Sequence, residues 1–520
     1  MRKKKDKTDV AETLAVIDIG SNSIRMVVGQ VLPDGELVIL ERLRRAVRLG
    51  QDTFRNGSIR AATMRSAVAI LRDYRHVLNT YGVNRLRAVA TSAVREATNG
   101  DTFVDRVLVA TGLEVSVISV TEEGRLTVSA VREAAGEKLL TGRTALVVEV
   151  GGGSTVLNLL RKGEIAASQS LPTGSIRMQE VLSTSTEPAD QAAKLIRHQV
   201  TSAISAFQSL LPLRNVQTFI AVGGDARWAA THVGTSVEGT DLKSVSQAKL
   251  DRLLDTCRHL TADELARTYH LPFTDAETIV PALFVYQALL TSTRARKMTV
   301  TEVSIRDGLL LDLVRDAAGR EDDAAYREAV QSALAVAQKY RVDMKHAEHT
   351  RFLAVRLFDK LAAEHRLGAR HRLLLEVAAL LHEVGTFVSS RAHHKHSFYL
   401  IAHAEILGLT QDELRIVANV ARYHRRSRPK PSHPDYSNLP RERRIIVNKL
   451  AALLRVADAL DNSRTQQVRE LDCRIDNDGL VISVDGAMDL TFENRSLAEK
   501  GDMLQDIYGL DVRLEGVRRS

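Results

Sequence analysis

The sequence predicts an α/β protein built from two similar halves, followed by an all-α domain and a small α+β domain. A short motif occurs twice, as AVIDIGSNSIRMVV at residues 15–28 and as LVVEVGGGSTVLNL at residues 146–159. Similar orders of strand and helix patterns come after the two copies, which indicates an internal duplication. From about residue 311 onward the hydrophobic spacing becomes that of amphipathic helices.

Each copy of the motif is expected to form a β-hairpin, because two apolar, β-branched runs flank a turn of small residues. A turn with few Cβ atoms leaves its backbone N–H groups accessible to phosphate oxygens. Asp18 and Glu149 end the first strand of their copies, where a carboxylate can hold a divalent cation beside a phosphate. One copy alone is more typical of an ordinary tight turn. Two copies facing one another indicate a phosphate-processing cleft.

The other elements of the two halves occur in the same order. After a strand meander, the first half has a helix over 59–80, a strand that enters a helix over 86–97, a strand over 113–120 and a connecting helix over 122–135. The second half has a meander over 146–172, a helix over 188–210, and a strand, Gly turn and helix over 216–230. Residues 322–467 are expected to be helical with a break around 425–440, and residues 471–520 return to alternation.

Composition bounds the class of protein. The 520 residues suffice for about three or four domains. No apolar run approaches the ~18 residues that span a bilayer, and no signal peptide is visible. Cys257 and Cys473 give neither a disulfide framework nor a zinc spacing, so a reducing, cytoplasmic setting is expected. The net charge of +8 favours an anionic partner or simply aids solubility, while 4% aromatic residues argue against single-stranded nucleic acid.

An ordered set of stretches resembles the exopolyphosphatase and guanosine-pentaphosphate phosphatase (Ppx/GppA) family, within the actin-like (ribonuclease H-like) superfamily. The matching stretches of the first 310 residues are DIGSNSIRMVV, VRLGQ, ATSAVREATN, ISVTEEGRL, VVEVGGGST, LPTGSIRM, AVGGDAR and SIRDGLL. Farther along, HAEHTRFLAVRLFDKL, LLHEVGTFVSSRAHHKHSFYLI, ARYHRRSRP and RVADALD resemble the helical HD-type domain of longer family members. The resemblance covers almost the whole chain.

The resemblance implies a domain plan and an activity. The expected parts are a flexible basic tail (1–12), actin-like domain I (13–135), actin-like domain II (136–310), a helical HD-type domain (311–470) and a small C-terminal α+β domain (471–520). The implied activity is exopolyphosphatase: release of orthophosphate from the end of inorganic polyphosphate by Mg²⁺-assisted in-line attack of water, with Mn²⁺ as an alternative ion. A homodimer is expected, with no membrane partner.

The resemblance also assigns roles to residues. Glu123 matches the catalytic glutamate before a small residue and an arginine, whereas Glu122 points elsewhere; without the other motifs, both are typical of solvated glutamates at a helix start. Asp18 and Glu149 are the expected metal ligands. The residues expected to bind phosphate are Ser21, Asn22, Ser23, Arg25, Ser92, Arg95, Gly151, Gly152, Gly153, Ser154, Thr155, Gly174, Arg177, Gly223 and Gly224.

The chain departs from the family pattern at several acids. Glu149 stands where an aspartate is usual, Val156 where a second glutamate is usual, and Val120 where glycine is frequent. Either the site binds metal more weakly, or its geometry is rebuilt around Asp18, Glu123 and Glu149, or only anion binding remains.

The HD-type part departs in parallel. Its expected metal ligands are His346, His382, Glu383 and Asp458, where the usual His-Asp pair has become His-Glu. These ligand types remain chemically possible, but a structural or anion-binding role is favoured over a metal centre. HHKH at 393–396 and YHRRSRPK at 423–430 fit anion binding.

Three alternatives to exopolyphosphatase remain at this point. The first is a guanosine pentaphosphate (pppGpp) 5′-phosphohydrolase, which would use the same machinery. The second is a sensor that binds polyphosphate or an alarmone without cleaving it, and is motivated by Glu149, Val156 and the His-Glu pair. The third, an ATPase or sugar kinase, is disfavoured because AVGGDAR runs into Arg227-Trp228 and no sugar-site motif is recognisable.

Overall fold

The computed structural model describes residues 12–33, 35–136, 139–140, 142–184, 187–207, 211–317, 323–476, 479–485 and 489–517. The chain divides into two compact units, Met1–Asp322 and Asp323–Ser520. Of the basic tail predicted for residues 1–12, all but Glu12 lies outside the described residues. No helix in the described ranges is long and apolar enough to cross a membrane.

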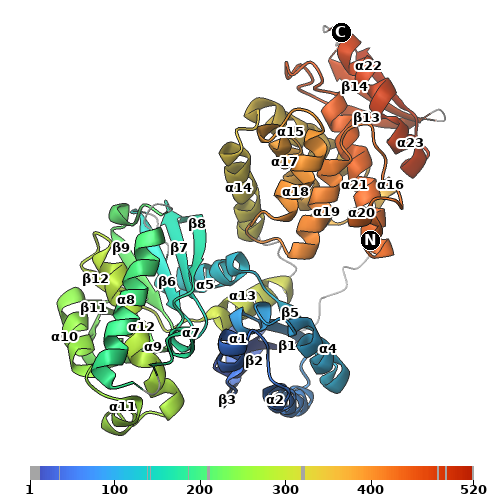
Figure 1. Ribbon diagram of the computed structural model, residues 1–520. Coiled ribbons are helices and arrows are strands. Elements are labelled where there is room, and N and C mark those ends of the chain that lie inside the picture. The colour runs from blue at the N-terminus through green and yellow to red at the C-terminus, as the bar shows by residue number, and fades with distance from the viewer. Residues whose placement is uncertain are drawn as a thin grey trace. The chain divides into compact units, whose positions relative to one another are not determined.

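The first sheet of unit 1 has the strand order β3-β2-β1-β4-β5. Its strands are β1 (Glu12–Ile19), β2 (Ser23–Val31), β3 (Leu37–Ala46), β4 (Arg85–Ala90) and β5 (Val115–Val117). Side chains alternate along β1, so Ala15 and Ile17 pack with α2 (Ala61–Thr80) and α4 (Gly100–Thr111), whereas Leu14 and Val16 face the opposite side. Both faces of the sheet are therefore covered (Figure 1).

The second face of this sheet is covered by two helices that sequence patterns placed elsewhere. They are α5 (Val120–Ala135) and α13 (Ile305–Ala317), which contribute Leu126 and Leu309 to the cluster around Leu14. The boundary predicted after residue 310 falls inside α13. Because α13 returns to the first sheet, the first lobe is completed by a segment from the far end of the second.

The second sheet has the order β10-β11-β12-β9-β6-β7-β8. Its strands are β6 (Ala145–Val150), β7 (Thr155–Arg161), β8 (Glu164–Leu171), β9 (Thr218–Val222), β10 (Thr235–Ser236), β11 (Lys243–Ser246) and β12 (Lys297–Val300). The run β8-β7-β6-β9 repeats β3-β2-β1-β4, with the same antiparallel and parallel pairings. The duplication read from the sequence is thus present in the topology.

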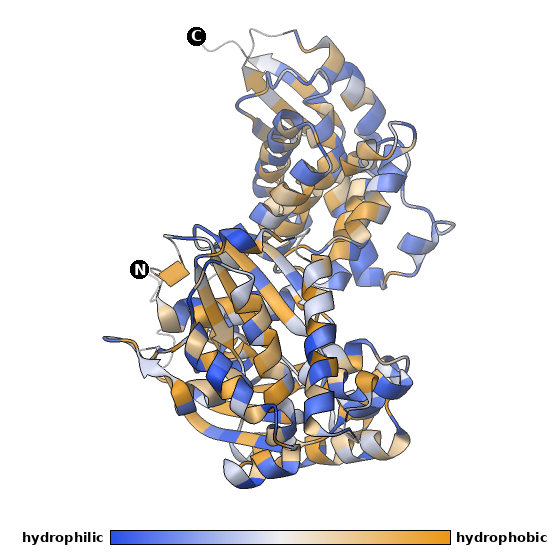
Figure 2. Cartoon of the chain, turned by 60° about the vertical axis from the view of Figure 1, so that its left-hand side comes forward, coloured by the Kyte–Doolittle hydropathy of each residue, from blue (hydrophilic) through white to orange (hydrophobic). Residues whose placement is uncertain are grey.

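Helices α8 (Ala189–Phe207) and α12 (Phe273–Thr291) pack on one face of the second sheet, and the continuation of α5 packs on the other. The apolar colour of the strands marks these buried layers in Figure 2. The other helices of unit 1 are α1 (Leu49–Asn56), α3 (Ser92–Arg95), α7 (Ser175–Leu182), η2 (Leu213–Asn215), α9 (Gly224–Val233), α10 (Gln247–Cys257) and α11 (Ala262–Thr268).

Unit 2 is a helical body with a small sheet. Its helices are α14 (Asp323–Lys339), α15 (Met344–Lys360), α16 (Ala362–His365), α17 (Ala369–Leu381), η3 (Val384–Phe387), α18 (His393–Ala402), α19 (Gln411–Arg422), α20 (Pro434–Ser437), α21 (Arg441–Ala459), α22 (Thr491–Lys500) and α23 (Asp502–Tyr508). The sheet β13 (Asp472–Asp476), β14 (Gly479–Asp485) and β15 (Val512–Val517) matches the expected α+β segment. Leu480 and Ile482 join the same hydrophobic core as the helices, so the predicted division at residue 470 crosses a shared core.

Candidate active site

The two copies of the motif form hairpins with the same backbone hydrogen bond across the turn. The Gly20 N–H donates to the Ser23 carbonyl at 3.1 Å, and the Gly151 N–H donates to the Ser154 carbonyl at 2.9 Å. The registers correspond too, because Asp18 pairs with Arg25 in the first hairpin and Glu149 pairs with Val156 in the second. Each residue of one turn therefore has a structural counterpart in the other.

Neighbouring helices hold the turn carbonyls. The Gly50 N–H donates to the Ser21 carbonyl at 2.8 Å, and the Ile176 and Arg177 N–H groups donate to the Gly152 carbonyl at 2.9 Å. The backbone N–H groups of Ser21, Asn22, Gly152 and Gly153 donate to no oxygen of the described residues. Such a pair of turns offers unpaired donors to an anion.

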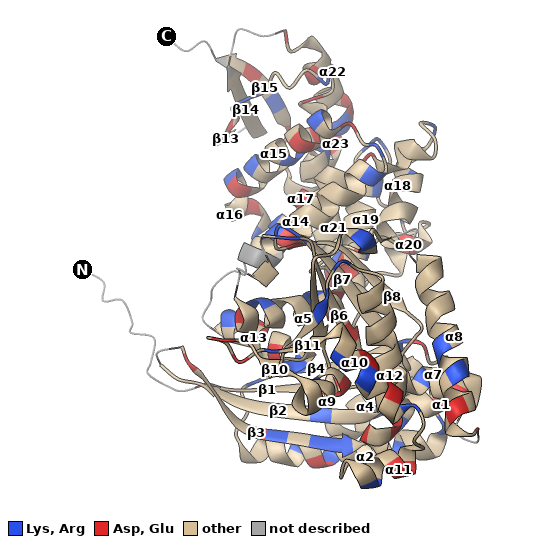
Figure 3. Cartoon of the chain, turned by 90° about the vertical axis from the view of Figure 1, so that its left-hand side faces the viewer, with Lys and Arg blue, Asp and Glu red and all other residues tan. Residues whose placement is uncertain are grey.

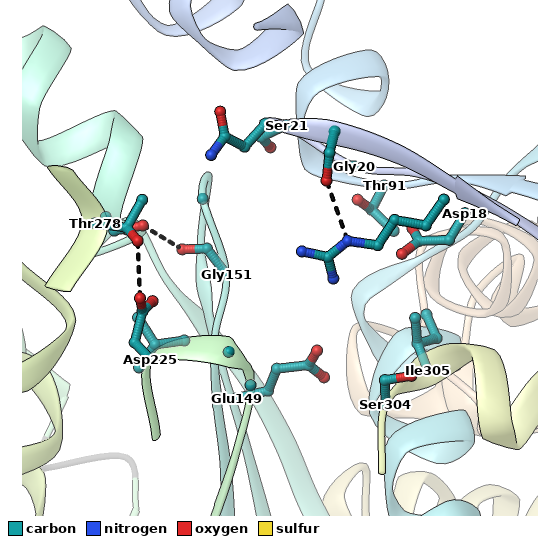
Figure 4. Close-up of a pocket in the computed structure, with 18 of the residues that line it drawn as sticks. Asp18, Gly20, Ser21, Thr91, Glu149, Gly151, Asp225, Thr278, Ser304 and Ile305 are labelled. Carbon is teal, nitrogen blue, oxygen red and sulfur yellow. Dashed lines mark hydrogen bonds between the residues drawn. The ribbon is translucent and has the colours of Figure 1, made fainter. Parts of the chain in front are cut away.

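The two turns line one cavity between the lobes, together with most of the predicted site residues. Figure 4 shows Glu149 pointing into this cavity, with Ser21 and Gly151 above it and Asp18 across from it. The predicted residues that line the cavity are Asp18, Ser21, Asn22, Ser23, Arg25, Ser92, Glu123, Glu149, Gly151, Gly152, Ser154, Gly223 and Gly224.

Four predicted phosphate ligands do not line the cavity: Gly153 belongs to the second turn itself, and Thr155, Gly174 and Arg177 support that turn. The Thr155 hydroxyl donates to the Thr173 carbonyl at 3.1 Å. A Cβ on Gly174 would lie 2.2 Å from the Gly153 carbonyl carbon, and one on Gly153 would lie 2.3 Å from Ser92 Oγ. Arg177 Nε donates to the Gly153 carbonyl at 2.5 Å. The placement of these four residues therefore favours packing and turn geometry over phosphate contact.

Glu123 reaches the cavity from the first turn of α5. Arg95 Nη1 lies 3.3 Å from Glu123 Oε2 and 2.8 Å from the Ile118 carbonyl, so Arg95 positions the carboxylate without lining the cavity. Burial, with the nearby Glu149 and Asp18 charges, raises the pKa of Glu123 to about 7, although Arg95 opposes this rise. A carboxylate with this pKa can accept a proton near neutral pH.

Glu122 points the other way, as the sequence suggested for adjacent residues. Its oxygens accept hydrogen bonds from Arg87 at 3.0 Å and from Arg125 at 2.9 and 3.0 Å. Arg87 and Arg125 also bind Asp312 on α13. This buried network fixes α5 against α13 and leaves Glu123 facing the cavity.

Asp18 and Glu149 each have a partner inside the protein. Arg306 Nη1 on α13 lies 3.0 Å from Asp18 Oδ2, and the Thr127 hydroxyl donates to Glu149 Oε2 at 2.7 Å. Burial and the Asp18 charge raise the pKa of Glu149 above its usual value. Positive charge placed near these acids would favour their ionised forms.

A group of arginines surrounds the acids. Arg25, Arg44, Arg227 and Arg306 all line the cavity, and the arginines of β3 are visible in Figure 3. Arg44 is paired with Asp275, whereas no carboxylate oxygen of the described residues lies within 4.0 Å of the Arg25 guanidinium. Burial and the neighbouring arginines lower the pKa of Arg25 to about 10. A bound anion would relieve this mutual repulsion.

Sequence reasoning missed several cavity residues. Arg227 and Arg306 stood inside the quoted stretches AVGGDAR and SIRDGLL, so the signal was present but not assigned. Asp225, in the same stretch as Arg227, accepts a hydrogen bond from the Thr278 hydroxyl at 2.8 Å, and burial raises its pKa to about 6. Arg44 lies in a strand of ordinary pattern, and only the fold brings it to the cavity.

The predicted magnesium ligands suit a partly hydrated ion. Asp18, Glu149 and Glu123 offer the hard oxygen ligands that Mg²⁺ prefers, on the wall of one cavity. Among the described residues, these three carboxylates do not bring one oxygen each to within 4.8 Å of one another. Mg²⁺ usually keeps several waters, so this donor set fits an ion held partly through water.

The four residues of the second predicted metal site lie together in unit 2. Asp458 Oδ1 is 3.3 Å from His346 Nε2 and 3.7 Å from His382 Nε2. His346, His382 and Glu383 have ligand atoms within 4.8 Å of one another. By contrast, Arg426 and Arg428 of the basic stretch pair with Glu499 and Asp502, so these two cations already have partners inside unit 2.

Comparison with known proteins identifies the family. The model of the Ppx/GppA phosphatase family matches residues 16–317, and the model of Ppx/GppA phosphatase domain III matches residues 328–506. The chain belongs to the Ppx/GppA phosphatase family. The sequence-based expectation of a phosphoanhydride hydrolase agrees with this membership.

Two curated Ppx/GppA relatives match along almost their whole length. The guanosine-5′-triphosphate,3′-diphosphate pyrophosphatase of Vibrio parahaemolyticus is 26% identical over 487 residues, which cover 91% of each chain. The protein of the same name from Vibrio vulnificus is 26% identical over 492 residues, with the same coverage.

Solved structures of the family show the fold. An exopolyphosphatase from Cytophaga hutchinsonii is 21% identical with a TM-score of 0.52, and the match covers 60% of this chain and 99% of that one. An exopolyphosphatase-like protein is 24% identical with a TM-score of 0.51, and covers 59% and 99%. Over that part of the chain, the predicted duplicated α/β fold agrees with the fold of these solved structures.

Proposed function

We propose that this Ppx/GppA protein removes the terminal phosphate of inorganic polyphosphate with Glu123 as the general base. The observation that carries the proposal is the buried Glu123 carboxylate, with a pKa of about 7, on a cavity lined by two turns. The N–H groups of Ser21, Asn22 and Gly152 in these turns have no partner among the described residues. Phosphoryl transfer needs positioning and charge stabilisation more than covalent chemistry, and this cavity offers both.

The terminal phosphate binds between the turns. The N–H groups of Ser21, Asn22 and Gly152 bind its oxygens, and the Arg25 guanidinium neutralises its charge. Glu123 takes a proton from a water molecule, whose oxygen attacks the terminal phosphorus. The bridging P–O bond breaks, orthophosphate leaves, and the chain departs one unit shorter as an oxyanion. Asp18 and Glu149 would hold Mg²⁺ or Mn²⁺, which would supply positive charge to stabilise the phosphate oxygens.

The second candidate substrate is pppGpp, which ends in the same phosphoanhydride. The observation that favours it is the name of the two relatives that match over 91% of the chain. The two substrates differ in the group attached to the terminal phosphates, which is a polymer in one and a guanosine in the other. The net charge of +8 supports polyphosphate, a polymeric anion, as the substrate.

We further propose a homodimer and an HD-type architecture for the helices of unit 2, as the resemblance implies. Light scattering coupled to size-exclusion chromatography tests the first. A monomer at micromolar concentration would contradict it.

The decisive experiment measures orthophosphate release from long polyphosphate and from pppGpp while Mg²⁺ is titrated. Glu123→Gln is expected to lower kcat by about 10²–10⁴-fold with little change in KM, because it removes the proton acceptor but not the phosphate ligands. Glu122→Gln is the matched control. It weakens the network with Arg87 and Arg125, so it lowers the melting temperature, but it should lower kcat far less than Glu123→Gln does, because Glu122 does not line the cavity.

Two outcomes would contradict the proposal. Turnover of neither substrate at millimolar Mg²⁺ would exclude both hydrolase candidates. Tight, salt-sensitive polyphosphate binding with no turnover, unaffected by Glu123→Gln, would instead establish the sensor.

A further inference from the structure

Unit 2 contains a group of four histidines near Asp458, three of them buried and the fourth, His393, half-buried. His346 lies in the first turn of α15, His382 comes directly after α17, His393 begins α18, His424 lies just beyond α19, and Asp458 lies near the end of α21. His346, His382 and His424 are at most 2% exposed, and Asp458 is 7% exposed. Five separate helices therefore bring chemically reactive side chains to one buried place.

Hydrogen bonds fix the tautomer of every ring. The Nδ1 atoms of His382, His424 and His393 lie 2.7, 2.6 and 3.3 Å from the carbonyl oxygens of Ala379, Ala421 and Ser390. The Nδ1 atom of His346 lies 2.8 Å from Asp461 Oδ2. Carbonyl and carboxylate oxygens only accept hydrogen bonds, so each Nδ1 carries the proton. In a neutral ring, each Nε2 then presents a lone pair.

These lone pairs face one another and a carboxylate. His393 Nε2 is 3.2 Å from His424 Nε2, and two lone pairs at that distance repel. Asp458 Oδ1 lies 3.3 Å from His346 Nε2 and 3.7 Å from His382 Nε2. Both of these Nε2 atoms are buried without a hydrogen-bond partner among the described residues. Orphaned acceptors converging in a buried space indicate a missing cation.

The acidic side chains are held so that their remaining oxygens face the histidines. Lys500 Nζ binds Asp458 Oδ2 at 2.6 Å, which leaves Oδ1 toward His346 and His382. Arg464 binds Glu383 Oε1 at 2.5 Å, and Glu383 still has a ligand atom within 4.8 Å of those of His346 and His382. Nδ1–H bonds to carbonyls and carboxylates, and carboxylates fixed by cations, are the outer interactions that orient metal ligands in proteins.

We propose that this cluster is a binding centre for first-row divalent transition metal ions, formed by Nε2 of His346, His382, His393 and His424 with Asp458 and Glu383. Imidazole nitrogen suits Zn²⁺, Fe²⁺, Co²⁺ or Ni²⁺, whereas Mg²⁺ prefers oxygen. The centre adds His393 and His424 to the four ligands expected from the sequence. It assigns them a metal-binding role instead of the anion-binding role that their basic stretches suggested. It does not depend on the phosphate site of unit 1.

The test uses the full chain, stripped with a chelator and titrated with Co²⁺ and, separately, Mg²⁺. Co²⁺ is expected to bind with at least one equivalent per chain and to give visible d–d absorption of a nitrogen-ligated ion, while Mg²⁺ does not compete. His382→Gln and His424→Gln are each expected to reduce Co²⁺ affinity by more than about tenfold. His403→Gln is the matched control, because His403 is exposed and its Nδ1 contacts only the Tyr399 carbonyl.

Glu123→Gln alters the cavity of unit 1 and should leave the d–d bands of nitrogen-ligated Co²⁺ unchanged, because these bands come from the centre in unit 2. Circular dichroism checks that the histidine variants fold, and Asp458→Asn provides a second route if one of them does not. Absence of the d–d bands of nitrogen-ligated Co²⁺ in the wild type would overturn the proposal, as would their survival in the combined His346→Gln and His382→Gln variant.

Discussion

In the first hairpin the turn is Gly20-Ser21-Asn22-Ser23, and in the second it is Gly151-Gly152-Gly153-Ser154. The backbone hydrogen bonds of the two turns match, but the first turn carries polar side chains, whereas the second consists mainly of glycines. A Cβ on Gly153 would lie 2.3 Å from Ser92 Oγ, 2.4 Å from Phe54 Cζ and 3.0 Å from Ser21 Oγ. The second turn is rich in glycine because the serines of the first lobe occupy that volume. The duplicated halves have therefore become complementary.

The acids and their cross-strand partners differ in the same way. Asp18 faces Arg25 across the first hairpin, whereas Glu149 faces the buried Val156 across the second. The first hairpin thus carries both charges, and the second carries only an acid whose pKa is raised. Substitutions at equivalent positions can test whether this asymmetry matters for the reaction.

Among the substitutions that compare the two hairpins, Arg25→Ala is expected to lower kcat/KM the most. Losing a charge-assisted contact to the phosphate, worth roughly 1.5–3 kcal/mol, should lower kcat/KM by about 10–100-fold. Val156→Ala at the equivalent position should cost roughly 1–3 kcal/mol of unfolding free energy and leave kcat/KM per folded molecule unchanged. Steady-state phosphate release and urea unfolding measure the two effects. Equal kinetic losses in both variants would show that the hairpins do not differ in function.

Gly153→Ala tests whether the second turn must yield space to the first. The added methyl group should push the turns apart, costing about 1–3 kcal/mol of stability and lowering kcat several-fold. Gly142→Ala is the control, since a Cβ there meets no atom within 4 Å. Unchanged melting temperature and kcat in Gly153→Ala would show that the turns can separate freely.

Glu149→Asp makes the second acid resemble the first. The shorter side chain should lose its 2.7 Å hydrogen bond to Thr127 and withdraw from the cavity. The Mg²⁺ concentration at half-maximal activity should then rise by about tenfold. A fall in that concentration would mean that aspartate is the better ligand here and that Glu149 weakens the site.

The smallest expected effect is on the pH dependence of stability. Burial raises the pKa of Glu123 from 4.5 to about 7, so the folded chain binds this proton more tightly than the unfolded chain does. The free energy of unfolding should therefore fall as pH rises from about 4.5 to 7, and Glu123→Gln should remove that part of the fall. Fluorescence of Trp228, the only tryptophan, reports unfolding of unit 1 in urea at several pH values. Parallel pH profiles for wild type and variant would contradict the assignment.

Local pattern was enough to predict the elements that hold the site. The hairpins around Gly20 and Gly151 have the strand length, β-branched content and small-residue turns that dictate this structure, and their repetition predicts paired lobes. The same reasoning could not place α13, because the pattern of an amphipathic helix does not indicate which sheet its apolar face will cover. Arg306 stood in the quoted stretch SIRDGLL, but its pairing with Asp18 follows only from the placement of α13.

The histidine cluster shows the same division. The resemblance to HD-type domains suggested His346, His382, Glu383 and Asp458, but His393 and His424 stood in basic stretches that were expected to bind anions. Their Nε2 atoms meet at 3.2 Å only because α18 and α19 pack together. Only the fold could bring these rings into one group.

The sequence by itself was enough to predict the duplicated hairpins, the family and the residues of the two small-residue turns. It also singled out Glu123 as the expected catalytic glutamate. Those features depend on neighbours along the chain, where strand pattern and turn chemistry act. Tertiary structure alone decided that Gly153 must yield to Ser21 and Ser92, that Arg87 and Arg125 bind Glu122, and that no acid of the described residues pairs with the Arg25 guanidinium. These depend on distances between residues far apart in the chain, which packing and burial set.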